Sequence, residues 1–326
     1  MDRRTLLKSG LAAGAGLAFP ASGQDAASAY PTRPVRVIVA FGPGGSTDIT
    51  ARVVNAKMAQ VFSQTFMVDN RPGGGSNIGA ELAARSAPDG YTLFLGTIAN
   101  AINMSLYKNL NYDLLRDFAP ISILSTAPAV LVVNPKLPVR NLKELIELAK
   151  TKPGVLNYAS SGTGTTPHLA GEMFNQRAGI KITHVPYKGA APALMDTIAG
   201  VTDMGFKTAL SAIPSIQSGQ IRALAVAASE RLELLPDVPT LAEAGLPDFE
   251  ITSWNGFFAP AKTNPEIIQR VSAACARISK MPDTRKTFAE QAAVSLSSTP
   301  VQFRAFIQSE IDRWGEVVRS IGVQVN

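Results

Sequence analysis

Two short loops rich in glycine and hydroxyl residues hold the groups in this chain that are best suited to binding chemistry. The first reads GPGGSTD, residues 42–48, and the second reads SSGTGTTPH, residues 160–168. Each lies between a strand-like run and a helix-like run, so its backbone N–H groups should gather at the positive end of a helix dipole. Such a loop is a seat for a carboxylate, a phosphate or a sulfate. The sequence therefore predicts anion binding. When each loop is considered alone, the alternative is that its residues are ordinary turn and helix-capping residues.

Neither loop carries a nucleotide-binding fingerprint. Both lack the third glycine of the dinucleotide motif and the Lys-Ser or Lys-Thr pair of the Walker phosphate loop. What they offer is a short anion cradle with hydroxyl groups from Ser46, Thr47, Ser161, Thr165 and Thr166. We therefore expect no nucleotide and no other cofactor.

Catalysis and metal binding are also disfavoured by the residue pattern. The chain has two histidines, His168 and His184, and no HExxH or Cys/His cluster, so we expect no metal site. Ser161 and His168 share a loop, but the G-x-S-x-G nucleophile elbow is absent. We expect a binding protein without catalytic residues; an enzyme that acts on a carboxylated substrate is the weaker alternative. Asp48 either contacts a ligand or caps the helix that begins beside it.

The elements around the loops alternate in a regular way. Short, largely apolar runs at 35–41, 91–96, 155–159 and 182–185 each lead into a polar loop and then a helical pattern. This alternation predicts α/β units with parallel sheets, in which ligands sit at the carboxyl ends of the strands. If the first two loops belong to one domain and the last two to another, all four face a common cleft.

The first 29 residues have the layout of an export signal. A basic start with Arg3 and Arg4 precedes an uncharged stretch rich in Gly, Ala and Leu and then small residues. The paired arginines favour the twin-arginine route, with the general secretory route as the alternative. The apolar stretch is shorter than the roughly 20 residues that a membrane-spanning helix needs. Cleavage of the signal peptide is expected after Ala29, and cleavage near Gly23 is the alternative.

The composition of the remaining chain fits a soluble protein of two domains. The leader holds three basic and two acidic residues, so its removal lowers the net charge from +6 to +5. The basic residues are scattered, so we expect no nucleic-acid partner. Residues 30–326 exceed what one hydrophobic core usually supports.

Five segments carry a family likeness in their order along the chain. They are YPTRPVRVIVAFGPGGSTDITAR (30–52), VDNRPGGGSNIGAELAARSAPDGYTL (68–93), YASSGTGTTPHLAGEMF (158–174), HVPYKGAAPALMD (184–196) and PDVPTLAEAGLPDFE (236–250). Together they resemble the Bug family of periplasmic solute-binding receptors, also called the tripartite tricarboxylate transporter receptor family. The resemblance implies an α/β, two-lobed periplasmic binding protein fold, type II-like, with a mainly parallel sheet flanked by helices in each lobe. It implies lobe 1 from residues 30–130 and 260–326 and lobe 2 from residues 131–259, after a signal peptide at 1–29.

The resemblance also implies a function and a site. The ligand would be a small carboxylate, mono- or dicarboxylate, aliphatic or aromatic, held between the lobes and delivered in the periplasm to the membrane subunits of a tripartite tricarboxylate-type transporter. A sensor that docks on a membrane sensor kinase is the alternative role, and a monomer is expected. Carried over by position, the lobe 1 contacts are Phe41, Gly44, Gly45, Ser46, Asp48, Thr97 and Asn100. The lobe 2 contacts are Ser161, Gly162, Gly164, Thr165 and Thr166, with Tyr187, Asp203 and Phe206 nearby. Lys207, which follows Phe206, either sets the polarity of the ligand or lies in solvent.

Overall fold

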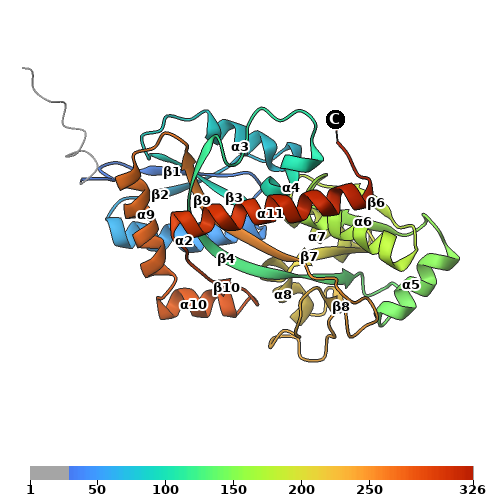
Figure 1. Ribbon diagram of the computed structural model, residues 1–326. Helices are drawn as coiled ribbons and strands as arrows, with labels where there is room; N and C mark the ends of the chain where they lie inside the picture. The colour runs from blue at the N-terminus through green and yellow to red at the C-terminus, as the bar shows by residue number, and fades with distance from the viewer. Residues whose placement is uncertain (1–28, 326) are drawn as a thin grey trace, which may run out of the picture.

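Two long strands run through the middle of the molecule and connect its halves. Strand β4 covers Phe118–Val133 and strand β9 covers Thr252–Pro260. The first part of β4 pairs with β9 up to Pro128, whereas its last five residues, from Ala129, pair with strands β7 and β8. The computed structural model, which describes residues 29–325, therefore has one strand that belongs to two sheets (Figure 1).

Lobe 1 is the half built around the first part of β4. Its strands follow the order β2-β1-β3-β9-β4, in which β1, β2 and β3 are parallel and β9 is antiparallel to both of its neighbours. The short strand β10 pairs with β4 at the far edge. The strands not yet bounded are β1 (Val35–Val39), β2 (Phe66–Asn70), β3 (Thr92–Thr97) and β10 (Val294–Ser295). The helices are α2 (Ser46–Phe62), η1 (Gly74–Ser76), α3 (Asn77–Ala84), α4 (Ile98–Leu106), α9 (Pro265–Ile278), α10 (Pro282–Ala289) and α11 (Pro300–Ile321).

Lobe 2 is the half built around the last part of β4. Its strands follow the order β4-β7-β5-β6, in which β5 is parallel to β6 and β7, while β7 and β8 are antiparallel to β4. The strands are β5 (Asn157–Ser160), β6 (Thr183–Pro186), β7 (Met204–Thr208) and β8 (Arg222–Val226). The helices are α5 (Leu142–Thr151), α6 (Thr166–Ala178), α7 (Ala190–Ala199) and α8 (Ala209–Gln217).

The strand sequences are apolar because both faces of each sheet are covered. In β1, Ile38 packs into one core with α3, α4 and α11, while Val37 and Val39 pack into another with α2 and α9. The same alternation in β4 places Leu131 and Val130 on opposite faces, the second of them against α8. Successive strand side chains point to opposite faces, so a strand buried on both sides reads as a continuous apolar run.

The predicted fold class is confirmed, with one addition. Each lobe has the predicted parallel strands and flanking helices, but the strands that join the lobes run antiparallel to their neighbours. The predicted lobe boundaries stay a proposal. Strand pairing favours a first change of lobe at Pro128–Ala129, where β4 changes its partner from β9 to β7. It favours a second change immediately before Thr252, because β9 pairs with the lobe 1 strands β3 and β4. The predicted export signal lies almost entirely outside the described residues.

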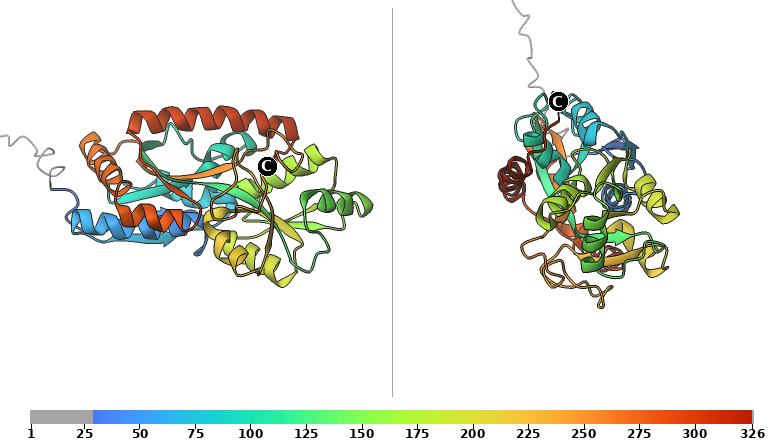
Figure 2. Two further views of the ribbon diagram at one scale, coloured as in Figure 1. Left: turned by 90° about the horizontal axis from the view of Figure 1, so that it is seen from below. Right: turned by 90° about the vertical axis from the view of Figure 1, so that its right-hand side faces the viewer.

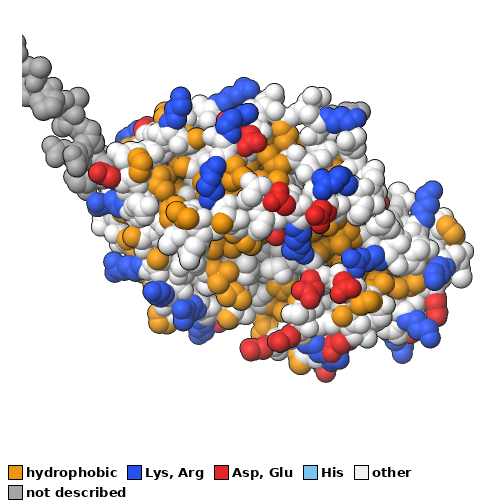
Figure 3. All heavy atoms as spheres, viewed as in Figure 1, with side chains coloured by type: hydrophobic (Ala, Val, Ile, Leu, Met, Phe, Trp, Pro, Cys, Tyr) orange, Lys and Arg blue, Asp and Glu red, His pale blue; other side chains and the backbone are white. Residues whose placement is uncertain are grey.

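No helix within residues 29–325 is long and apolar enough to cross a bilayer. On the face drawn in Figure 3, basic and acidic side chains are intermixed rather than gathered into a basic patch.

The C-terminal helix α11 is attached to the crossing strands. Figures 1 and 2 show it lying along the molecule over β4 and β9, with its end close to α6. Glu310 on α11 is 6% exposed and accepts hydrogen bonds from the indole N–H groups of Trp254 on β9 (2.9 Å) and Trp314 (3.3 Å). One buried carboxylate thus anchors the helix to a strand that joins the lobes.

We predict that Glu310→Ala lowers the free energy of unfolding by about 2–4 kcal/mol, because two buried indole N–H groups lose their acceptor. The exposed Glu316 on the same helix is the matched control, and Glu316→Ala should change stability by less than about 0.5 kcal/mol. Urea denaturation followed by tryptophan fluorescence measures both. Equal stabilities for the two variants would contradict the anchoring role of Glu310.

Candidate functional site

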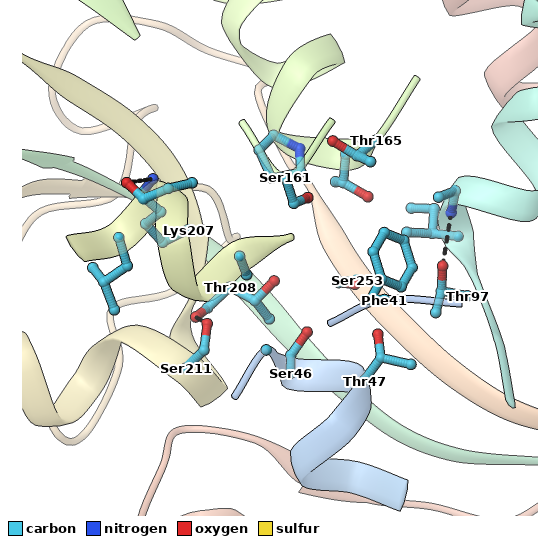
Figure 4. Close-up of a pocket in the computed structure, with 18 residues that line it drawn as sticks. Phe41, Ser46, Thr47, Thr97, Ser161, Thr165, Lys207, Thr208, Ser211 and Ser253 are labelled. Carbon is cyan, nitrogen blue, oxygen red and sulfur yellow. Dashed lines mark hydrogen bonds between the residues drawn. The ribbon is translucent and has the colours of Figure 1, made fainter. Parts of the chain in front are cut away.

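A cavity between the two lobes is lined by both predicted loops (Figure 4). Its lobe 1 residues are Phe41, Gly45, Ser46, Thr47, Thr97, Ile98, Ala99 and Ser253. Its lobe 2 residues are Ser161, Thr165, Thr166, Pro167, Ala190, Ala193, Leu194, Lys207, Thr208 and Ser211. It leaves about 50 Å³ for the centres of water-sized molecules, which corresponds to about four water positions. The space suits a small molecule.

Five helices begin at this cavity. The first residues of α2, α4 and α6, together with Ala190 of α7 and the residue Thr208 that precedes α8, all line it. The N-terminus of each helix carries a partial positive charge from its dipole. Their convergence makes the cavity electropositive before any side-chain charge is counted.

Four of these helix ends have no side chain that caps them. The N-cap residues Gly45, Thr165, Gly189 and Thr208 make no capping hydrogen bond to α2, α6, α7 and α8. Thr97 caps α4, the fifth of these helices; of the helices that begin elsewhere, α5, α9 and α11 are capped by Asn141, Asn264 and Thr299, while α3 and α10 are not capped. Uncapped first turns leave backbone N–H donors free for a ligand.

The side chains around the cavity add donors and no acid. No Asp or Glu is among the described residues that line it, and Lys207 is the one charged side chain there. Lys207 is 4% exposed, and burial lowers the pKa of its ammonium to about 7. Every other polar lining side chain is a serine or threonine hydroxyl. The arrangement can bind an anion and has no group to neutralise a cation.

The first loop is held in place by Asp48. Its carboxylate accepts hydrogen bonds from the Gly44 N–H (3.0 Å), the Asn70 side chain (3.0 Å) and Arg52, and Asn70 also donates to the Phe41 carbonyl. Burial opposes ionisation, but the bonds from Arg52, Gly44 and Asn70 together hold the pKa of Asp48 below its usual value. Asp48 therefore organises the loop and does not line the cavity.

The second loop is held by buried polar groups beneath it. The Ser160 hydroxyl is hydrogen-bonded to His184 Nε2 (2.6 Å), and it also accepts a hydrogen bond from the Gly162 N–H (3.1 Å). The Gly164 N–H donates to His168 Nδ1 (3.2 Å), and the two imidazole rings stack at 4.2 Å. Burial and the neighbouring His168 lower the pKa of His184 to about 3, and burial also lowers the pKa of His168. Both imidazoles are neutral supports of the loop.

The structure gathers about half of the predicted site residues in the cavity. Those that line it are Phe41, Gly45, Ser46, Thr97, Ser161, Thr165 and Thr166. Gly162 and Tyr187 line a second hollow that adjoins the cavity at Phe41 and Ser161. Their contact with a ligand stays a prediction.

The other predicted residues lie outside both hollows and have structural partners. Asn100 completes the capping box of α4 with Thr97, and Asp203 accepts a hydrogen bond from the Asn157 N–H. Phe206 is fully buried and stacks on Phe249 in the core. The remaining three are Asp48, described above, Gly44, whose N–H bonds Asp48, and Gly164, which packs against Asn103 and Leu106.

Several lining residues were missed by sequence reasoning. Thr208 and Ser211 lie at the start of α8, where the strand–helix pattern of 204–217 offered a signal that went unused. Ser253 lies on a crossing strand, where a single serine carries no local signal. Within residues 29–325, no group of three His, Cys, Asp or Glu side chains is placed to hold a metal ion.

The two lobes touch around the cavity. Tyr107 on the lobe 1 side donates a hydrogen bond to the Thr163 carbonyl of the second loop (3.3 Å). A Cβ atom on Gly75, which has φ +62°, would lie 2.3 Å from the same carbonyl oxygen. The lobes are therefore closed on each other, and glycine at position 75 permits the close approach.

Comparison with known proteins finds a family model and a relative that point to the same family. The family model described as the tripartite tricarboxylate transporter family receptor matches residues 50–323. Protein BugT of Bordetella pertussis is 39% identical over 313 residues, which cover 95% of each chain.

Two solved structures of proteins with small dicarboxylic acids resemble this one. A protein of R. palustris with adipate is 34% identical with a TM-score of 0.88, and the match covers 90% of this chain and 99% of that one. MatC from Rhodopseudomonas palustris with bound malate is 33% identical with a TM-score of 0.85, and the match covers 89% of this chain and all of that one.

We predict that acid weakens the fold through the histidine pair. The pKa of His184 is about 3 in the folded protein and about 6.5 when unfolded, so between these values the unfolded chain binds more protons and stability falls as pH falls. Thermal melts from pH 7.5 to 4.5 should therefore show a shallower decline for His184→Gln, which cannot be protonated, than for the unaltered protein. Parallel declines would contradict this assignment. The carboxylates with lowered pKa, such as Asp48, lose their contribution only at lower pH.

Proposed function

Because this chain belongs to the tripartite tricarboxylate transporter receptor family, we propose that it captures a small carboxylate between its lobes and delivers it to the membrane subunits of such a transporter. It is a binding receptor and not an enzyme. The observation that carries the proposal is the closed interlobe cavity onto which four uncapped helix N-termini converge without an acidic side chain.

The donors of the cavity match the needs of a carboxylate. A hydrogen bond to a charged group contributes about 1.5–3 kcal/mol, and a micromolar ligand requires about 8 kcal/mol in total. Three or four such bonds reach this value only when little ordering is needed on binding. Both loops meet this condition, because Asp48 and the histidine pair hold them without a ligand. The relatives solved with adipate and malate support the same ligand class.

The two lobes suit capture by hinge motion. The crossings in β4 and before β9 are the natural places for the chain to bend, and closure buries the ligand between the loops. The predicted contacts in the cavity, Phe41, Gly45 and Ser46 from lobe 1 and Ser161, Thr165 and Thr166 from lobe 2, would then meet the ligand from both sides.

Location and partners are part of the same proposal. We propose a periplasmic receptor, exported by the signal at residues 1–29 through the twin-arginine or the general secretory route, that works as a monomer. A role in sensing, with a membrane sensor kinase as the partner, is separable by a deletion strain. Lost uptake of the ligand supports delivery to a transporter, whereas intact uptake with lost gene induction supports sensing.

We predict micromolar binding of at least one small carboxylate. Isothermal calorimetry and thermal shift with a panel of aliphatic and aromatic mono- and dicarboxylates should give a Kd on the order of 1–100 μM for the best ligand. The corresponding amide should bind at least about 30-fold more weakly, because it lacks the charge that the helix ends stabilise. A panel without heat or thermal shift would overturn the proposed function.

We predict that closure of the two lobes requires glycine at position 75. Gly75→Ala places a Cβ against the Thr163 carbonyl and should weaken the best carboxylate of the panel by about 10- to 100-fold, equal to about 1.4–2.8 kcal/mol. Gly179→Ala is the matched control, because Gly179 also has φ +62° but a Cβ there meets nothing within 4 Å. Equal affinities for the two variants would show that the closed contact does not contribute to binding.

A further inference from the structure

Lys207 is a buried cation at one end of the cavity. It lies on β7, and Figure 4 shows it across the cavity from Thr97 and Phe41. Because strand side chains alternate, its neighbour Phe206 enters the apolar core while Lys207 faces the side covered by α7. The position is therefore set by the strand and not by a flexible surface loop.

No acidic side chain neutralises this lysine. The Nζ atom donates to the carbonyl oxygens of Ala193 (3.1 Å) and Ala159 (3.5 Å), and no ion pair joins it to an acid within residues 29–325. An ammonium has three N–H donors, so the hydrogen bonds to these two carbonyls leave one N–H donor without an acceptor. A buried ammonium without a counter-ion is costly, and such groups are paired in most proteins.

The acids on the surrounding elements are engaged elsewhere. Asp196 on α7 accepts a hydrogen bond from Tyr187, and Asp203 before β7 accepts one from the Asn157 N–H. Glu172 on α6 accepts from Tyr158 of β5. The segment of β4 that pairs with β7, and helix α8, contain no charged residue. Among residues 29–325, these elements therefore leave no acid placed to pair with Lys207.

We propose that the Lys207 ammonium pairs with a second anionic group of the ligand, and that it thereby makes the receptor selective for molecules with an anion at each end. This inference rests on the proposed function, since the first anion is the carboxylate held by the loops at 42–48 and 160–168. The loops explain why an anion binds, and Lys207 explains which anions bind best.

Proton uptake follows from the same pairing. Burial lowers the pKa of Lys207 to about 7, so most of the empty receptor carries a neutral amine there at pH 8. A carboxylate brought against it favours the charged form and raises that pKa. Binding of a diacid at pH 8 therefore takes one proton from the buffer onto Nζ, and binding of a monoacid does not.

The test compares chain-matched acids on the purified receptor. Malonate, succinate, glutarate and adipate are titrated beside propionate, butyrate, pentanoate and hexanoate, in triethanolamine and in Tris, two cationic buffers whose ionisation heats differ. The unaltered receptor should prefer its best diacid at least about 10-fold over the matched monoacid and take up close to one proton per diacid at pH 8. Lys207→Met should lose about 10- to 100-fold in diacid affinity and the proton uptake, with monoacid affinity within about threefold.

Control variants separate a charge role from a structural one. Lys181→Met removes an exposed lysine of the same lobe that lines neither hollow, and it should keep both the preference and the proton uptake. If Lys207→Met does not fold, Lys207→Gln, which keeps an uncharged N–H donor on the side chain, should fold and show the same loss of preference.

Three results would contradict this account, and each would overturn a different part of it. A diacid preference or proton uptake that persists in the folded Lys207 variant overturns the role of Lys207. A receptor that binds monoacids as well as diacids overturns the selectivity and leaves the carboxylate function standing. A receptor that binds no carboxylate in any form overturns the proposed function itself.

Discussion

The structure depends on one electrostatic constraint, the meeting of several positive helix ends in a closed space to which residues 29–325 contribute no acidic side chain. Helices α2, α6, α7 and α8 direct uncapped first turns at this space, and Lys207 adds a buried amine whose pKa is lowered to about 7. Like partial charges repel more strongly in a low-dielectric interior than in water. The arrangement is stable only when water or an anion occupies it, so closure of the lobes and binding of an anion favour each other.

The rest of the fold holds the two loops in place within each lobe. Parallel strands aim their carboxyl ends at the cavity, and buried groups secure each loop from behind, Asp48 in lobe 1 and the His168–His184 pair in lobe 2. The chain crosses between the halves in β4 and before β9, and helix α11 packs against both halves. The loops therefore need little reordering on binding, and the free energy cost is concentrated in the hinge.

Much of this could be predicted from sequence, because strand–loop–helix alternation and glycine-rich loops are local signals. They placed Gly45, Ser46, Ser161 and Thr165 at one cavity. Local signals did not decide between neighbours on a strand: Phe206 and Lys207 were both considered, and the face that each presents depends on which helices cover the sheet. Nor did they show the antiparallel crossing strands or Ser253, since pairing between distant segments leaves no local pattern.

The central claim is that this cavity binds a small organic carboxylate. Mass spectrometry of the small molecules released from receptor purified from the periplasm without refolding tests it most directly. The account predicts one stoichiometric small acid with a carboxylate at each end. A stoichiometric neutral molecule, an organic cation or a nucleotide in its place would contradict it.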